Sequence, residues 1–563
     1  MCLGGVCSGP CRQNDGAGPE PGRVRMRGLR NTGGGRLHPA VGDLVDQVMD
    51  GSLDRRAFLR TVAWLGVSVP SAQALLGVTG CAPASAVSAQ RRLRFVCAVQ
   101  QITDPALTTW IEASNLFRNS LEFLTEVDAD NITHPYLAES WTPSDDLKTW
   151  RFQLRQGIKW SNGDVFDVDD VAFNFRRWLD PKSQSVNRTS FAAIRDFERL
   201  GDYAFALHLN RPVCSLPEQL YAFTCPILHR RFEQEGGDWP KNPVGTGPFQ
   251  LTGYEVGRSA RFHRRPTYWG ERPRVEEIDY IDLGPDVATH VAALAAGQVD
   301  VLYRVTISEL DLVKRLPHAR LLRTPAAHTL VMRMQSDQKP FDDIRVRQAV
   351  LSAADNAAML KFAYRGFGVV GENTHVAPTQ PDYAALPPRP RDVAKARRLL
   401  AEAGHPNGVD LTLTLGNTQG RWEQDTAQIL QQNCAEAGIR IRLNVIPPAE
   451  YWSVWDKTPF GLTYWSHRPL GVMLYDLAYR SGSVWNESRF ADPEFDHALD
   501  AAMAVLDPKA RAAQMARAEA ILRDRAVIIQ PYWPEKFTAV ADRVIGHRVH
   551  PSDYFRMDRV GLA

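Results

Sequence analysis

The sequence contains no continuous apolar run of the roughly 20 residues that a membrane-spanning helix needs. A moderately apolar segment at 61–77 is interrupted by Ser68, Pro70, Ser71 and Gln73. The chain also has no excess of one charge, because 66 basic and 64 acidic residues give a formal net charge of +2 at pH 7. These absences argue against a permanent transmembrane helix and against a nucleic-acid-binding protein.

Cysteine is scarce. Of the eight cysteines, three precede residue 12 with no second half of a zinc site after them, and one is Cys81. The remaining four are too few for a disulfide scaffold. Cys214 and Cys225 lie eleven positions apart. They could form one bridge in an oxidising compartment, or both could remain buried thiols.

Motifs of common catalytic sites are also absent. After residue 81 the sequence has no G-x-S-x-G, no H-E-x-x-H and no closely spaced cysteine pair. The chain therefore lacks the characteristic motifs of serine hydrolases, zinc proteases and thiol oxidoreductases. We expect no enzyme, no cofactor and no metal, while an exported enzyme or a surface structural protein stays as the alternative from another class.

An export signal is present at residues 54–81. Arg55 and Arg56 are followed by F-L-R, then by the moderately apolar segment, and V-T-G directly precedes Cys81. This order predicts a twin-arginine signal peptide at 54–80 and a lipid-modified Cys81 as the first mature residue. The protein would then be periplasmic, or extracytoplasmic, and lipid-anchored to a membrane. The alternative is a buried amphipathic helix with an incidental arginine pair.

Residues 1–53 show little apolar periodicity and are rich in Gly, Arg and Pro. We expect them to be a disordered or over-annotated extension, with Met26 as an alternative start. After residue 60 the charge is almost balanced, at 57 basic and 58 acidic residues.

Alternating patterns follow at 136–175. Trp150, Phe152 and Leu154 alternate as in a strand, and Trp160 is expected to end a second strand. Asn-Gly at 162–163 predicts a hairpin turn, and V-D-D at 168–170 predicts the start of a helix.

Strand and helix patterns also alternate later in the chain. Residues 411–415 and 439–445 read as strands around a helix at 422–437, which is a β-α-β unit. Residues 392–403 predict a surface helix that ends at Gly404. A helix is expected near 111–124, and another after 344 with Arg345 and Arg347 in solvent. The sequence therefore predicts α/β lobes.

Several motifs occur together in a recognisable order. Y-L-A-E-S-W at 136–141 is followed by N-P-V-G-T-G-P-F at 242–249, F-D-D-I-R-V-R-Q-A at 341–349 and F-A-D-P-E-F-D at 490–496. The chain resembles the solute-binding proteins, family 5, of peptide and nickel ABC importers. The glycines at 245 and 247 are interpreted as scaffold, because no phosphate-loop residues follow them.

The resemblance implies a two-lobed periplasmic-binding-protein type II fold of the large peptide-binding subclass. Lobe I would span 81–330, with an extra subdomain inserted at about 126–238. Lobe II would span 331–522, and 523–563 would return to lobe I. The chain would cross between the lobes near 329–334 and 522–532, and such hinges let lobes close on a ligand.

The segment most informative about the ligand is Y-W-S-H-R-P-L-G at 464–471. In peptide-binding relatives a Trp is followed three residues later by an Asp that pairs with the peptide's α-ammonium. Here Trp465 matches the Trp, but Arg468 occupies the Asp position. Because like charges repel in a desolvated cleft, the resemblance predicts that Arg468 meets an anionic or carbonyl-rich part of the ligand instead.

Alternatives remain open at this segment. A shifted loop would give the acid's role to Asp476, and His467 is either a loop residue or a metal ligand. The full set of candidate ligand-binding residues is Trp465, Ser466, His467, Arg468, Tyr479, Trp485 and Asn486.

We therefore expect a monomeric substrate-binding lipoprotein that delivers peptides or related small solutes to an ABC permease in the inner membrane. The alternative within binding is a receptor for a non-peptide anionic solute or a metal chelate.

Overall fold

The computed structural model describes residues 47–48, 52 and 91–563, except 184 and 186. The sheets of the described residues all belong to one compact unit, which lies within residues 87–563. The predicted export residues Arg55, Arg56 and Cys81 lie outside the described residues. Within the described part, no helix is both long and apolar enough to cross a membrane.

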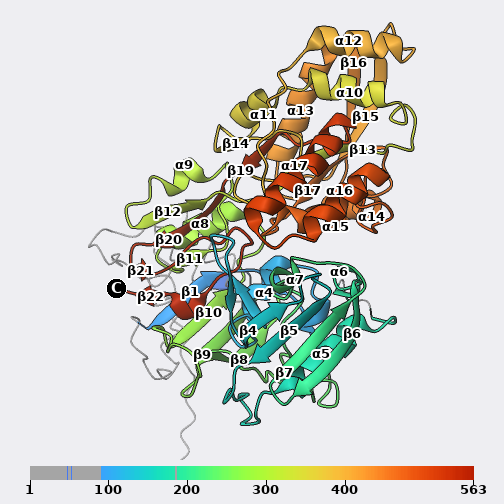
Figure 1. The fold of residues 1–563 in the computed structure, drawn as a ribbon. Coiled ribbons are helices and arrows are strands. Elements are labelled where there is room, and N and C mark those ends of the chain that lie inside the picture. Colours follow the sequence, from blue (N-terminus) through green and yellow to red (C-terminus); the bar gives the residue numbers. More distant parts are fainter. Residues whose placement is uncertain (1–46, 49–51, 53–90, 184, 186) are drawn as a thin grey trace, which may run out of the picture. The chain divides into compact units, whose positions relative to one another are not determined.

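The first lobe is built on a seven-stranded sheet (Figure 1). Its central strand β1 pairs in parallel with β10 and β11, and the outer pairs are antiparallel. Leu93 and Phe95 on β1 are completely buried, so this strand lies in the core. In spatial order the strands are β12 (Ala319–Thr324), β20 (Lys536–Ala541), β11 (Val301–Leu302), β1 (Arg92–Val96), β10 (Glu277–Ile281), β9 (Ser259–Arg264) and β8 (Phe249–Glu255).

Short elements accompany this sheet. The helix expected at 111–124 is shorter than predicted, because it ends at Phe117. The accompanying elements are α4 (Ile111–Phe117), α7 (Leu216–Gln219), α8 (Val287–Ala295), α9 (Leu310–Val313), the hairpin β2 (Thr125–Val127) and β3 (Thr133–Pro135), the pair β21 (Val544–Ile545) and β22 (Gly561–Leu562), and the 3₁₀ turns η1 (Pro105–Leu107) and η2 (Met557–Arg559).

A separate four-stranded sheet follows β3 in the chain. Its order is β4 (Ala138–Pro143), β5 (Thr149–Leu154), β7 (Ala204–Leu209) and β6 (Ile194–Gly201), with helices α5 (Val168–Leu179) and α6 (Asn187–Ser190). Stacked rings of Phe152, Phe205 and Phe197 join three strands, with centroids 4.9 and 5.0 Å apart. The alternation predicted for β5 is confirmed, but the second strand is reduced to a single bridge between Lys159 and Val165.

The second lobe contains a five-stranded sheet in the order β16 (Ile439–Val445), β15 (Val409–Leu415), β17 (Phe460–Trp465), β13 (Thr329–Met334) and β18 (Ile528–Ile529). Strands β15 and β16 are parallel and α13 connects them, so the predicted β-α-β unit is confirmed. The helices are α10 (Ile344–Ala353), α11 (Asn356–Ala363), α12 (Val393–Glu402), α13 (Trp422–Ala435), α14 (Pro448–Val454), α15 (Gly471–Ala478), α16 (Pro493–Met503) and α17 (Pro508–Asp524).

Aspartate starts many of these helices. Its carboxylate accepts a hydrogen bond from a backbone N–H of the first turn, which satisfies a donor that has no partner within the helix. The capping residues of α5, α8, α10, α11, α12, α16 and α17 are Asp167, Asp286, Asp343, Asp355, Asp392, Asp492 and Asp507. Local chemistry therefore fixes where these helices begin.

Two short links connect the large sheets. β12 ends at Thr324 and β13 begins at Thr329, so residues 325–328 lead from the seven-stranded to the five-stranded sheet. On return, β18 ends at Ile529 and β20 begins at Lys536. Between them β19 (Tyr532–Pro534) pairs with β14 (Gly368–Val370).

Gly245 and Gly247 lie against the turn that follows α4. A Cβ on Gly245 would come within 1.9 Å of the Ser120 carbonyl oxygen, and one on Gly247 within 2.9 Å of the Asn119 carbonyl oxygen. The Gly247 N–H donates to the Ser120 carbonyl at 2.9 Å. These glycines permit a close backbone approach, which agrees with their interpretation as scaffold.

The cysteines in the described residues are free thiols, and all four are buried. Burial raises the pKa of Cys214 and of Cys225 to about 12. Of the two possibilities that the sequence left open, the structure has the buried thiols.

Arg347 is a correction to the sequence analysis. It is buried, not solvated, because its guanidinium donates to the carbonyls of Phe341 and Arg525. Arg345 is exposed, as expected.

Candidate functional site

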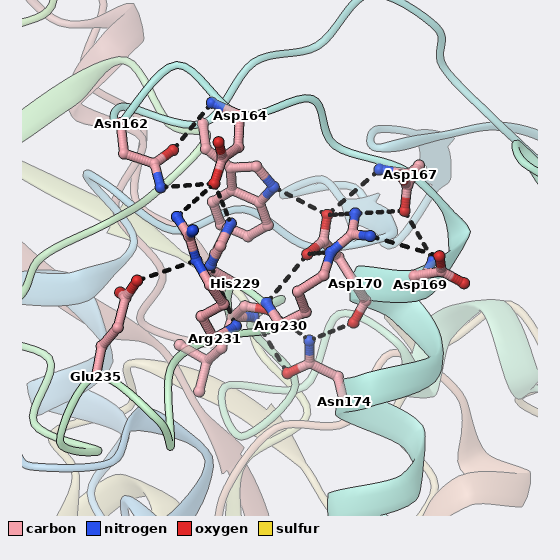
Figure 2. A network of polar contacts seen from close by, with 12 residues as sticks. Asn162, Asp164, Asp167, Asp169, Asp170, Asn174, His229, Arg230, Arg231 and Glu235 are labelled. Atoms are coloured by element: carbon pink, nitrogen blue, oxygen red, sulfur yellow. Dashed lines mark hydrogen bonds and ion pairs between the residues drawn. The ribbon is translucent and has the colours of Figure 1, made fainter.

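The acidic motif before α5 forms a closed network of ion pairs (Figure 2). The completely buried Asp170 carboxylate accepts hydrogen bonds from Arg230 Nε and Trp160 Nε1, each at 2.9 Å. Asp164 accepts from Arg231 at 2.6 Å. Each of these acids already has a cation, so the motif supports the fold. Within the described residues, no group of three or more His, Cys, Asp or Glu is arranged to hold a metal.

Trp465 ends β17 and is buried. Its Nε1 donates to Glu487 at 2.7 Å, and the same carboxylate accepts from Thr463 at 2.6 Å and from Arg333 Nε at 2.9 Å. Burial raises the pKa of Glu487, and the Arg333 charge opposes this rise. The Trp465 indole N–H is therefore occupied within the protein, which leaves its ring for packing.

Trp465 is also the inner end of a row of four indole rings. Its ring centroid lies 6.0 Å from that of Trp485. Trp485 lies 6.2 Å from Trp455, and Trp455 lies 6.3 Å from Trp452. The row ends at Trp452, which is 40% exposed. These edge-to-face contacts give Trp485 a packing role next to Trp465.

The polar groups of Tyr479 and Asn486 form hydrogen bonds within the protein. The buried Tyr479 hydroxyl pairs with His375 Nδ1 at 2.6 Å. Asn486 donates to the Phe490 carbonyl at 2.7 Å and accepts from Ser488 Oγ at 2.8 Å. Both side chains stabilise the walls around Trp465 and do not present free polar groups.

His467 connects the two lobes. Its Nδ1 accepts from the Ala327 backbone N–H at 2.9 Å, and its Nε2 lies 2.8 Å from Asn131 Oδ1 in the β2–β3 hairpin. This pattern requires the neutral tautomer with the proton on Nε2. Burial lowers the pKa of His467 well below its usual range. Both ring nitrogens are occupied, so the geometry offers none to a metal.

Arg468 is half-buried and carries an uncompensated charge. Its Nη1 donates to Ser466 Oγ at 2.8 Å and to the His467 carbonyl at 3.0 Å. Among the described residues, no carboxylate lies within 4.0 Å of it, and its Nε and Nη2 have no hydrogen-bond partner without being enclosed. Burial lowers the pKa of this guanidinium, which nevertheless stays charged at neutral pH.

Asp476, the alternative acid, is already neutralised. It lies 2.7 Å from Arg211 and 2.5 Å from Arg480. The pair with Arg211 joins the two lobes, as does the hydrogen bond of 3.1 Å from the Cys214 N–H to the Met503 carbonyl. Asp476 therefore contributes to contact between lobes.

Arg118 and Tyr554 form a further contact, which no sequence motif indicates. The Arg118 Cζ lies 3.6 Å from the Tyr554 ring centre, and the two residues are 436 positions apart. An arginine directly after the buried Leu116 and Phe117 is the one local feature that could have indicated Arg118.

Two cavities in the structure lie elsewhere. One of about 1010 Å³ is in the second lobe, lined among others by Asn356, Arg389 and Arg523. The other, of about 570 Å³, adjoins Arg155 and Trp269. Neither contains a predicted site residue. The predicted residues instead surround Arg468, in the contact region between the lobes where His467 meets Asn131.

Comparison with known families identifies the chain. The profile described as "Bacterial extracellular solute-binding proteins, family 5 Middle" matches residues 133–476, more than half of the sequence. The chain belongs to this family. As a family 5 protein it is extracytoplasmic, and it is a transport receptor, not an enzyme. It is the substrate-binding protein of an ABC importer for peptides or related solutes.

The relatives have low sequence identity to this chain, but the matches cover most of both proteins. Heme-binding protein A of Haemophilus influenzae is 26% identical over 456 residues, covering 75% of this chain and 82% of the relative. Glutathione-binding protein GsiB of Salmonella paratyphi A is 25% identical over 456 residues, covering 77% and 87%.

Among solved structures, DppA of Helicobacter pylori in complex with the peptide STSA superposes with a TM-score of 0.71. It is 23% identical and covers 84% of this chain and 98% of that chain. The likeness confirms the two-lobed type II periplasmic-binding-protein fold of the peptide-binding subclass.

Proposed function

We propose that this family 5 protein is a lipid-anchored monomer that captures an acidic solute between its lobes and delivers it to an inner-membrane ABC permease. Residues 325–328 and 530–535 serve as the hinges. The observation that carries the ligand class is the Arg468 guanidinium, which has unused donors and no carboxylate partner among the described residues.

The charge of Arg468 decides the ligand's chemistry. A guanidinium does not lose its proton at neutral pH, and its planar donors fit a carboxylate or a phosphate. A free α-ammonium at this place would be repelled. Two relatives are named for heme and glutathione, which are acidic molecules, and this agrees with an acidic solute.

The ligand is tested by extracting what co-purifies, identifying it by mass spectrometry, and titrating it back by calorimetry. A charge-assisted contact contributes roughly 1.5–3 kcal/mol, so Arg468→Ala should weaken binding by about one to two decades. Arg468→Asp should lose the acidic ligand and gain ordinary dipeptide binding. Wild-type affinity in both variants would place Arg468 outside the site.

The anchor is tested separately. V-T-G directly before Cys81 supports lipid attachment to this thiol, and acyl chains would hold the protein at the membrane. Cys81→Ala should release the protein from the membrane fraction, and replacing Arg55 and Arg56 by Lys should stop export. Unchanged fractionation of Cys81→Ala would refute the anchor without affecting the ligand.

A further inference from the structure

Arg118, directly after α4, is half-buried and contacts three aromatic rings. Its Cζ lies 3.6 Å from the ring centre of Tyr554, 4.1 Å from that of Phe123 and 4.6 Å from that of Tyr221. Its Nη2 donates to the Tyr221 carbonyl at 3.1 Å, and its Nε to Ser114 Oγ at 3.4 Å. Aromatic rings attract a cation through their quadrupole but have no net charge. The rings hold this guanidinium without neutralising it.

Nearby acids do not neutralise Arg118 either. In the part of the chain that the structure describes, no carboxylate lies within 4.0 Å of its guanidinium. Glu126 pairs with Arg556 and Arg559, and Asp553 pairs with Lys536. The Nη1 of Arg118 has no hydrogen-bond partner and is not enclosed. One donor and one full charge thus remain for a ligand.

Arg118 and Arg468 lie in the same region, one on each lobe. His550 packs against Tyr554 with centroids 5.4 Å apart, and its Nε2 donates to the Val127 carbonyl at 3.0 Å. Val127 ends β2, and the hairpin that follows carries Asn131, the partner of His467. Burial raises the pKa of Tyr554, and the charges of both Arg118 and Arg468 oppose this rise.

The histidines between them add no charge at neutral pH. Burial lowers the pKa of His550 to about 4 and that of His467 well below its usual range. The two guanidiniums therefore give this contact region two positive charges that no described residue cancels.

We propose that Arg118 and Arg468 bind the same ligand from opposite lobes, so that the ligand carries two acidic groups, either two carboxylates or a carboxylate and a phosphate. This rests on the proposed function and adds the contact on the first lobe. Closure would place each acidic group on one guanidinium, which explains why neither arginine has a carboxylate partner among the described residues.

Matched dipeptides test this by calorimetry on the exported protein, all of them N-acetylated so that no α-ammonium opposes the guanidiniums. Alanylglutamate carries two carboxylates, alanylglutamine has one fewer at the same shape, and phosphoserylglycine carries a phosphate and a carboxylate. Wild type should bind alanylglutamate or phosphoserylglycine at least about tenfold tighter than alanylglutamine. Arg118→Met should lose this preference, and Arg118→Lys should retain part of it. Arg489→Met, an exposed arginine paired with Asp337, is the control and should bind like wild type.

The outcomes separate this inference from the proposed function. Loss of binding in Arg468→Met with full preference retained in Arg118→Met would overturn the inference and leave the proposed function standing. Equal binding of alanylglutamate and alanylglutamine by wild type, or no binding of either two-acid probe, would also overturn it. If both arginine variants bound like wild type, the inference and the proposed acidic site would fall together. Thermal melting checks that each variant is folded. The preference between probes is a ratio of affinities and does not depend on the folded fraction.

Discussion

Arg230, beside α5, and Arg468, after β17, are both partly buried arginines with different surroundings. Arg230 contacts the carboxylates of Asp167 and Asp170, so its charge is cancelled within the fold (Figure 2). Arg468 donates to neutral oxygens of its own loop. The comparison shows that an acid-rich motif conspicuous in the sequence can be purely structural, whereas the Arg468 guanidinium keeps a charge that no carboxylate of the described residues cancels.

The largest effect on stability is expected when Arg230 is removed from the structural network. Arg230→Met leaves the completely buried Asp170 without its cation, which should cost about 3–5 kcal/mol of unfolding free energy. Arg468→Met removes a charge without a carboxylate partner and should change stability by less than about 1 kcal/mol. Denaturant unfolding measures both, with the exposed Arg231→Met as the control. Equal losses in Arg230→Met and Arg468→Met would mean that Arg468 is structural.

Glu519 provides a second contrast, because it is a buried acid that stays protonated at neutral pH. One of its oxygens accepts from the Ala384 N–H at 3.2 Å and the other has no partner. Burial raises its pKa from 4.5 to about 9. Since the folded state holds this proton more tightly, the stabilisation is full below about pH 4.5 and is lost as pH rises through about 9.

In wild type the free energy of unfolding should therefore fall by about 1.4 kcal/mol per pH unit in that range, and Glu519→Gln should remove this fall. At pH 8 it should stabilise the protein by roughly 2–4 kcal/mol, as measured by denaturant unfolding from about pH 5 to 9. The exposed Glu402→Gln serves as the control. A pH profile identical to wild type would show that Glu519 titrates normally.

A smaller effect is expected at the contact between lobes. Arg211→Ala removes the pair with Asp476, which is partly exposed and keeps Arg480 as a second partner. The free energy of lobe closure should become less favourable by about 0.5–1 kcal/mol. Affinity for the co-purified ligand should therefore fall about two- to fivefold. Lys241→Ala, which removes a pair with Asp238 within the first lobe, should leave affinity unchanged. A loss confined to stability would contradict a role in closure.

The smallest effect concerns the thiols. Because Cys214 and Cys225 are free, a reducing agent should leave the melting temperature unchanged. Counting thiols on the unfolded, unreduced mature protein that begins at Cys81 should give four besides Cys81. Two would mean that a bridge forms.

Local patterns determined how much of the fold could be predicted. The β-α-β unit and the surface helix that ends before Gly404 depend on residues within one or two turns, and these predictions are confirmed. Buried polar partners could not be predicted, since Arg333 and Glu487 are 154 positions apart. Arg347 was placed in solvent because one of its carbonyl partners, that of Arg525, is 178 positions away.

The site divides in the same way. Arg468 was found because a short motif fixes its register, and its role as a ligand contact stays a prediction. Trp465, Tyr479 and Asn486 follow from the same segment, but their polar atoms turned out to be occupied by the protein. Arg118 was not predicted, because two of its three aromatic partners, Tyr221 and Tyr554, lie 103 and 436 positions away in the chain.

The row of indoles from Trp452 to Trp465 has an optical consequence. Rings about 6 Å apart exchange excitation before they emit, so light absorbed by the buried Trp465 also emerges from the partly exposed Trp452. A water-soluble quencher that reaches only Trp452 therefore dims all four rings. A rearrangement of the loop after Trp465 should therefore change the emission of Trp452, which gives a fluorescence readout for testing the proposed ligand contacts.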